Sequence, residues 1–193
     1  MRWPLDTENR VLPDEPGQFG AVRRHDVHTG VDLYCELGTR VVAMEPGRVV
    51  GVEPFTGAHV PGADTSPWWN DTWVVLVLGD VSGKVIAYGE VGTVAVAVGD
   101  ALEAGQQIGV ISTSVLRRFK GRPMVMLHVE VYNGLPDGYT GSVLAAGDVS
   151  ATVWWKCDEA RPARLGDPTS LLEPMATAVF DMASYQPGVF SVG

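Results

Sequence analysis

The chain has 193 residues, of which 46% are hydrophobic, so its length suits one domain around a single core. Its formal net charge is −9, which disfavours nucleic acid and anionic membranes as partners because the electrostatic contribution to binding would be repulsive. The sequence has no Sec-type signal at its start and no apolar run approaching the roughly 20 residues of a membrane span.

The chain is expected to divide into an arm, a domain and a tail. Residues 1–19 contain Pro4, Pro13 and Pro16 without a sustained hydrophobic period, so we expect an irregular arm laid over the domain, without chemistry of its own. Residues 20–173 form the expected domain. Residues 174–193 form a tail in which the sequence allows one short helix, over residues 174–183.

Short apolar runs separated by turn residues predict an all-β fold. The 23 glycines and 13 prolines are spread along the chain, which favours many short strands over long helices. The expected strands are 31–35, 40–44, 48–52, 72–78, 84–91, 93–100, 102–111 and 124–132. Adjacent runs joined by tight turns are typical of hairpins, so we predict an antiparallel sheet or sandwich with long loops.

Residues 55–71 interrupt this rhythm with a long loop that contains the pair Trp68-Trp69. Loops of this length within a compact domain are usually functional or disordered, and paired tryptophans argue against disorder. We expect the loop to wall a cleft, with Trp68 and Trp69 contacting a peptide or glycan substrate. Anchoring of the loop is the structural alternative for both side chains.

Alternation along residues 124–132 separates a core face from a cleft face, because side chains two apart share a face. Val125, Leu127, Val129 and Val131 are all apolar and must face the core. Met126, His128 and Glu130 therefore face a cleft.

The same argument sorts two other segments. Asp32 is expected to face the cleft while Cys35 faces the core, so Cys35 is a poor candidate for a metal ligand. Tyr88 and Glu90 are expected to point together into the cleft.

His28, Asp32 and His128 form a candidate metal-ligand set. His28 and Asp32 are four residues apart around Gly30, and His128 comes from a distant strand. Two imidazoles and one carboxylate are the ligands of a catalytic type of zinc site, which leaves its fourth position to water. His25 and His59 are more simply explained as hydrogen-bonded structural residues.

These residues resemble the lysostaphin-like zinc peptidoglycan endopeptidases. The matching motifs, in chain order over roughly residues 20–172, are His28-Thr-Gly-Val-Asp32, Tyr88-Gly-Glu90, Val98-Gly-Asp100, Met126-Leu-His128-Val-Glu130 and Asp167-Pro168. The resemblance implies an antiparallel β architecture with a cleft over one sheet. It also implies Zn²⁺ as cofactor, held by His28, Asp32 and His128, and a cell-wall peptide or glycan as partner.

The sequence departs from the family pattern at two positions. The non-ligand histidines of the family fall on Glu90 and Met126, and in the family they are thought to activate the attacking water and to stabilise the oxyanion. General acid–base catalysis typically contributes about 100-fold to 10,000-fold, and methionine cannot take up a proton. Glu90 is the candidate substitute, either as base or as a fourth ligand that closes the site; His25 and His59 are the other candidates.

Three functions compete at this point. The first is a zinc-dependent endopeptidase of cell-wall peptides, with Glu90 as base and Tyr88 near the cleft. The second is a catalytically impaired zinc-binding relative that binds peptide or glycan. The third, a lipoyl-type carrier, is disfavoured because Lys84 is the only lysine near a hairpin tip and lacks the required context. Without a Sec signal, an enzyme of this kind would be cytoplasmic or delivered by a phage or virion.

Overall fold

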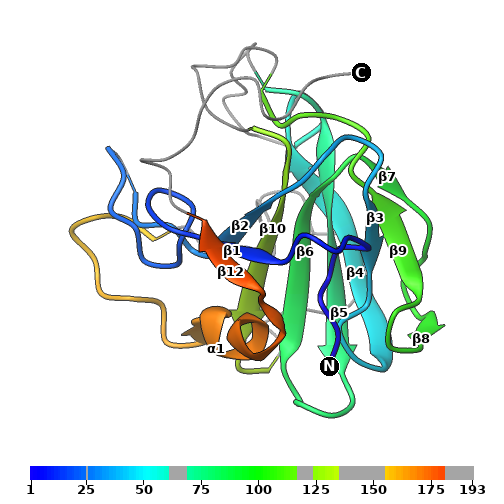
Figure 1. Cartoon of the computed structure of the whole chain (residues 1–193). Coiled ribbons are helices and arrows are strands. Elements are labelled where there is room, and N and C mark those ends of the chain that lie inside the picture. The colour runs from blue at the N-terminus through cyan, green and yellow to red at the C-terminus, as the bar shows by residue number, and fades with distance from the viewer. Residues whose placement is uncertain (25, 61–68, 117–123, 135–154, 181–193) are drawn as a thin grey trace.

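The computed structural model describes residues 1–24, 26–60, 69–116, 124–134 and 155–180. Nearly all of their regular structure is antiparallel β-strand, as the sequence predicts (Figure 1). None of the described helices is long and apolar enough to cross a bilayer. The elements are β1 (Val11–Pro13), β2 (Val31–Tyr34), β3 (Arg40–Val42), β4 (Gly47–Thr56), β5 (Thr72–Gly79), β6 (Val85–Val91), β7 (Thr93–Val94), β8 (Ala101–Leu102), β9 (Gln107–Val110), β10 (Met126–Tyr132), β11 (Leu165–Gly166), α1 (Thr169–Leu172), η1 (Glu173–Met175) and β12 (Ala178–Phe180).

The described strands form one large sheet, one small sheet and one parallel pair. The large sheet has the order β11-β10-β6-β5-β4-β8, and β2 also pairs with β10. Because β2 pairs with the first half of β10 and β11 with its end, β10 has β6 on one side and β2 and β11 on the other. The small sheet has the order β3-β9-β7 and lies beside the large one in Figure 1. β1 and β12 run parallel.

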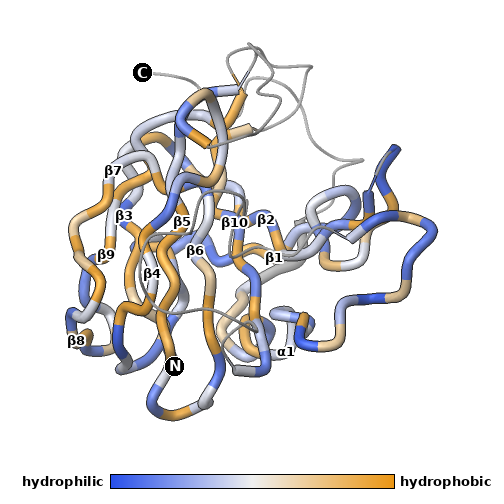
Figure 2. The backbone as a smooth tube through the Cα atoms, turned by 180° about the vertical axis from the view of Figure 1, so that it is seen from behind, coloured by the Kyte–Doolittle hydropathy of each residue, from blue (hydrophilic) through white to orange (hydrophobic). Residues whose placement is uncertain are grey.

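Apolar side chains cover both faces of the large sheet. The larger cluster lies between the two sheets, with Val75, Leu127 and Val129 on one side and Val41 and Ile108 on the other. A smaller cluster occupies the opposite face of β5, β6 and β10. In Figure 2 the strands carry most of the hydrophobic residues and the turns are mainly hydrophilic. The core face expected for β10 is therefore confirmed.

Residues before the first long strand complete the larger cluster. Trp3, Leu5 and Leu12 are buried within it, with at most 7% of each side chain exposed. Leu5 forms an isolated bridge with Val41 of β3, which holds this segment against the small sheet. The start of the chain therefore covers an edge of the core that the strands alone leave open.

The end of the described chain differs from the expected helix over residues 174–183. The chain forms the short helices α1 and η1 and then the strand β12, so the helix that the sequence allows does not form over residues 176–180, and residues 181–183 lie outside the described residues. The backbone becomes extended at Ala176, with φ −72° and ψ 146°. The backbone N–H of Thr177 then donates to the carbonyl of Arg10. Pairing with β1 therefore overrides the weak local preference for helix.

The structure also contradicts the expected orientation of Tyr88. Tyr88 lies opposite Val129 in the ladder and is fully buried in the larger cluster, on the face away from His128. Its hydroxyl accepts a hydrogen bond of 2.9 Å from the backbone N–H of Met44, and burial raises its pKa far above the ordinary value. His128 is paired with Gly89, so the site face of β6 carries residues 87 and 89 rather than Tyr88.

Replacing Tyr88 with phenylalanine should therefore lower stability without affecting metal binding. The substitution leaves the N–H of Met44 without its acceptor, and we expect a loss of about 1 to 3 kcal/mol in the free energy of unfolding. Urea denaturation measures this loss and titration with zinc measures the binding. Tyr132→Phe is the matched comparison on the opposite face, since its hydroxyl donates to Glu130. A large loss of zinc affinity in Tyr88→Phe would contradict the structural role.

Candidate metal centre

Three donor atoms from two segments converge on one point at the edge of the large sheet. Asp32 of β2 lies directly opposite His128 of β10, and His28 precedes β2. His128 Nδ1 lies 2.8 Å from Asp32 Oδ1, and His28 Nε2 lies 3.1 Å from each of these two atoms. All three side chains are buried, and the ligand atoms that they offer lie within 4.8 Å of one another.

This donor set fits a zinc ion. Zinc binds imidazole nitrogen and carboxylate oxygen at roughly 2.0 to 2.2 Å, which places tetrahedral donors about 3.3 Å apart. The separations of 2.8 to 3.1 Å are close to that spacing. His28, Asp32 and His128, the three ligands expected from the sequence, are thus brought together.

The remaining polar atom of each candidate ligand is engaged by a neighbour. His28 Nδ1 donates to the carbonyl of Gln18 at 2.9 Å, and His128 Nε2 donates to Glu130 Oε1 at 2.9 Å. Arg23 donates to Asp32 Oδ2, also at 2.9 Å. Such partners orient ligands and select their tautomers, so His28 Nε2, His128 Nδ1 and Asp32 Oδ1 are the atoms left for a metal. Gln18 belongs to the segment for which the sequence predicted no chemistry.

The carboxylate of Glu130 holds the outer side of His128. It is buried and also accepts hydrogen bonds from the hydroxyls of Thr29 and Tyr132. Burial by itself would raise its pKa, but the hydrogen bond and charge of His128, with the two hydroxyls, hold the pKa below its ordinary value. Glu130 is therefore an anion that stabilises the imidazole. The sequence placed Glu130 on the cleft face with His128, and the structure adds the hydrogen bond between the two side chains.

Gly30 leaves the space that the His128 ring occupies. A Cβ at this position would lie 2.4 Å from the carbonyl oxygen of Val129 and 2.7 Å from His128 Nε2. No L side chain is accommodated at such distances without movement of the ring or the strand. The glycine between His28 and Asp32 is thus required by packing.

Glu90 lies at an irregularity of β6 near the three donors. Val91 pairs with Trp73, and Tyr88 pairs with Val75, so three steps along β6 match only two steps along β5. This extra residue is a β-bulge, and Glu90 within it has a positive φ of 64°. Positive φ is uncommon for residues other than glycine and clusters at functional sites. The bulge explains why Glu90 does not follow Tyr88 onto the core face.

The carboxyl group of Glu90 is buried without a partner. Its Oε2 has no hydrogen bond, and burial, followed by the negative charge of Asp32, raises its pKa to about 8, with His128 and Arg23 acting in the opposite direction. These electrostatic interactions indicate that Glu90 lies within range of the candidate ligands. A buried carboxyl group with a raised pKa in such a place is typical of functional sites.

The other residues expected at the site are placed as follows. Met126 is buried two residues before His128 and lies opposite Tyr34. Trp69 is 42% exposed, and Trp68 and His25 lie outside the described residues. His59 Nε2 is hydrogen-bonded to the carbonyl of Thr72 at 2.8 Å, as expected for a structural histidine, so this nitrogen is already occupied.

Phe55 is a site neighbour that the sequence did not indicate. Its ring centroid lies 5.6 Å from that of His128, and a Cβ on Gly89 would lie 2.9 Å from the Phe55 ring. β4 continues to Thr56, beyond the expected strand end at residue 52, and this extension carries Phe55 to the site. No local pattern marks Phe55, because only the pairing of distant strands brings it to His128.

Comparison with known proteins identifies the family. Residues 26–139, more than half of the chain, match the sequence model of peptidase family M23. The chain belongs to peptidase family M23. The match spans the three candidate ligands, Glu90 and Glu130, and it confirms the family resemblance seen in the sequence. No curated protein matches this M23 chain in sequence.

Solved structures of this type resemble the M23 chain at low sequence identity. LytU is 16% identical with a TM-score of 0.50, over 90% of this chain and 91% of that one. The catalytic domain of the antimicrobial peptidase lysostaphin from Staphylococcus simulans is 20% identical with a TM-score of 0.48. This match covers 81% of this chain and 89% of that domain. A longer lysostaphin structure is 19% identical with a TM-score of 0.46, and the match covers 79% of this chain and 45% of that one. The LytU match supports a shared fold.

Gly30→Ala should weaken zinc binding because the added methyl group collides with the His128 ring. Changes that disturb the surroundings of a ligand typically cost 10-fold to 100-fold in metal affinity, and we expect a loss in that range. Competition with a chromophoric chelator measures it. Gly166→Ala in β11 is the matched control, since a Cβ there meets only ordinary contacts at 3.5 Å or more. Equal affinities for both variants would contradict the packing argument.

Zinc binding to the metal-free protein should release a proton from His128. Burial disfavours the charged ring, but hydrogen bonds and charges of Asp32 and Glu130 raise its pKa to about 10. The pKa of His128 is higher in the folded than in the unfolded protein. The charged ring therefore stabilises the metal-free protein fully below pH ~6.5, and this stabilisation is lost as the pH rises through ~10. Zinc affinity should therefore increase with pH over that window. Calorimetry in buffers of different ionisation enthalpy counts the protons; an affinity independent of pH would contradict the prediction.

Proposed function

We propose that this M23 chain is a zinc-dependent endopeptidase that hydrolyses peptide bonds in bacterial cell walls. The observation that carries the proposal is the convergence of His28, Asp32 and His128 beside the buried, unpartnered carboxyl group of Glu90. Three protein donors leave room for water and substrate, which is the arrangement of catalytic zinc sites. Membership of family M23 makes peptide hydrolysis the reaction class.

Zinc in this centre would supply a Lewis acid that polarises the scissile carbonyl and acidifies a water molecule. In its ionised form, which predominates above a pKa of about 8 in the metal-free protein, Glu90 would accept the proton of the attacking water and return it to the nitrogen of the leaving amine as the C–N bond breaks. Arg23, Gln18 and Glu130 keep the three donors oriented throughout. Met126 holds the other position expected for a histidine and cannot exchange a proton.

A cell-wall peptide, or the glycan attached to it, is the proposed substrate. Trp69 is 42% exposed, and Trp69 and Trp68 are the proposed substrate-binding residues. Aromatic rings of this kind bind peptide and sugar groups through broad apolar contacts. The lysostaphin whose catalytic domain resembles this chain is described as an antimicrobial peptidase, which agrees with a bacterial wall substrate.

A specific observation favours one second candidate, a closed and non-catalytic zinc site. Because Glu90 Oε2 has no hydrogen-bond partner, the same oxygen is available as a fourth ligand. The chain would then use its metal for stability and act as a peptide-binding or glycan-binding relative. The two candidates differ in whether Glu90 contributes to zinc affinity.

Glu90→Gln separates the two candidates when activity and zinc affinity are measured on the same samples. For an endopeptidase, release of amino groups from purified cell walls should fall by about 100-fold to 10,000-fold while zinc affinity stays nearly constant. For a closed site, zinc affinity should fall, and the cobalt-substituted protein should change its visible spectrum. Glu36→Gln, at an exposed carboxylate, is the control.

The double variant Glu90→His, Met126→His supplies the opposite test, because it introduces both histidines of the family pattern. If the zinc-loaded natural chain cleaves neither cell walls nor glycine-rich peptides while the double variant does, the endopeptidase proposal is overturned and the binding relative is supported. If the natural chain is active and loses activity in Glu90→Gln at unchanged zinc affinity, the proposal stands.

A further inference from the structure

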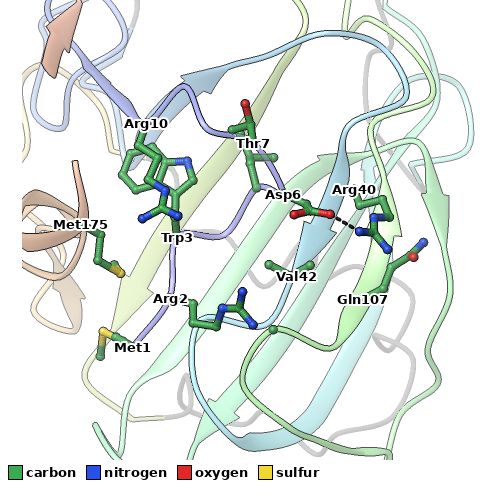
Figure 3. Close-up of a pocket in the computed structure, with 12 residues that line it drawn as sticks. Met1, Arg2, Trp3, Asp6, Thr7, Arg10, Arg40, Val42, Gln107 and Met175 are labelled. Atoms are coloured by element: carbon green, nitrogen blue, oxygen red, sulfur yellow. Dashed lines mark hydrogen bonds and ion pairs between the residues drawn. The ribbon is translucent and has the colours of Figure 1, made fainter. Parts of the chain in front are cut away.

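A pocket that shares no lining residue with the metal centre lies between the start of the chain and the small sheet (Figure 3). Its volume is about 340 Å³, within the range of small-molecule sites. Residues 1–10 form one wall, β3 and β9 contribute Arg40, Val42 and Gln107, and Met175 closes the side opposite Arg40. None of the candidate zinc ligands lines it, and the larger apolar cluster underlies the small sheet here.

The lining is positively charged although the chain is acidic. Arg2, Arg10 and Arg40 face one acidic side chain, Asp6, so the pocket carries a formal charge of +2 in a chain of net charge −9. Only Arg40 is paired, with Asp6 at the rim. Among the described residues, the side chains of Arg2 and Arg10 have neither a hydrogen-bond partner nor an ion-pair partner. Two guanidinium groups are therefore available to an anion.

The pocket also contains an unused buried donor. Trp3 is 4% exposed and lines the pocket, and its indole Nε1 has no hydrogen-bond partner. Buried polar groups are nearly always paired, so this N–H marks an unsatisfied position in the wall of the pocket, although the nitrogen itself is buried and not open to the pocket. Thr7 and Gln107 add a hydroxyl and an amide to the same lining.

Arg2 is held in place. Its backbone N–H donates to the carbonyl of Met44 at 2.7 Å, and its guanidinium packs on Gly105, where a Cβ would lie 2.2 Å from Nη1. The backbone of Arg2 is therefore fixed while its exposed guanidinium stays free, and the fork of donors matches phosphate and carboxylate oxygens.

We infer that this pocket binds a small ligand bearing an oxyanion, a phosphate ester or a carboxylate, held by the guanidinium groups of Arg2 and Arg10. The inference is independent of the proposed peptidase activity, because the pocket shares no residue with the metal centre. Because of its positive charge, the pocket would attract an anionic group of a polymer or metabolite even though the protein as a whole is acidic.

Titration of the zinc-loaded protein, followed by ¹H–¹⁵N NMR, tests the inference with three probes: inorganic phosphate, glycerol 3-phosphate and N-acetylglycine. We expect a dissociation constant on the order of 1 mM at low salt for at least one probe. The amides of residues 2–10 and the Trp3 indole, assigned with Trp3→Phe, should shift together. Tighter binding of the two phosphates would show that the natural ligand carries a phosphate group. Tighter binding of N-acetylglycine would show that it carries a carboxylate.

Arg10→Gln should weaken binding about tenfold, the effect of losing one charge-assisted hydrogen bond. Arg10 joins the fold through its carbonyl, so the substitution leaves that contact intact. Arg48→Gln is the matched control, an exposed arginine on β4 that donates to the carbonyl of Gly99 and does not line the pocket. The inference is overturned if no probe shifts the pocket resonances, or if Arg48→Gln weakens binding as much as Arg10→Gln. Shifts confined to residues near His128 show binding to zinc alone and also overturn it.

Discussion

The pairing of Asp32 with His128 across β2 and β10 is the contact on which the rest of the site depends. Both side chains are buried, and a buried charge is stable only when other groups compensate it. The two imidazoles do this for Asp32, whose pKa lies far below its ordinary value even though burial acts in the opposite direction. A shift of β2 by one residue against β10 would turn Asp32 towards the apolar face and dismantle the centre.

The neighbours of this pair explain several features that have no separate function. A side chain at residue 30 would collide with the His128 ring, and a side chain at residue 89 would collide with the Phe55 ring, so both positions are glycine. Glu130 is anionic because two hydroxyls and an imidazole donate to it. These residues hold a preformed set of donors, so zinc binding would require little rearrangement beyond the loss of a proton.

Near the candidate ligands, β6 combines a bulge with a glutamate at residue 90. A strand without the bulge would direct this side chain into the core beside Tyr88, where a carboxyl group would destabilise the fold. The bulge turns it towards the charged groups of the site at the expense of a left-handed backbone. The strain and the missing hydrogen bond are compatible with a carboxylate that meets its partner only when metal or substrate is present.

The sequence by itself determined the all-β class, the core face of β10 and the three candidate ligands, because alternation and ligand chemistry are local properties of the chain. It did not reveal that Tyr88 faces the core, that β12 forms where the sequence allowed a helix, or that Gln18 and Phe55 adjoin the ligands. It placed Glu130 on the cleft face but did not reveal its hydrogen bond to His128. Those features depend on which strands pair and in which register, and a bulge changes the face of every later residue. Only the tertiary structure decides such contacts, since they join segments that have no mutual preference until the sheets form.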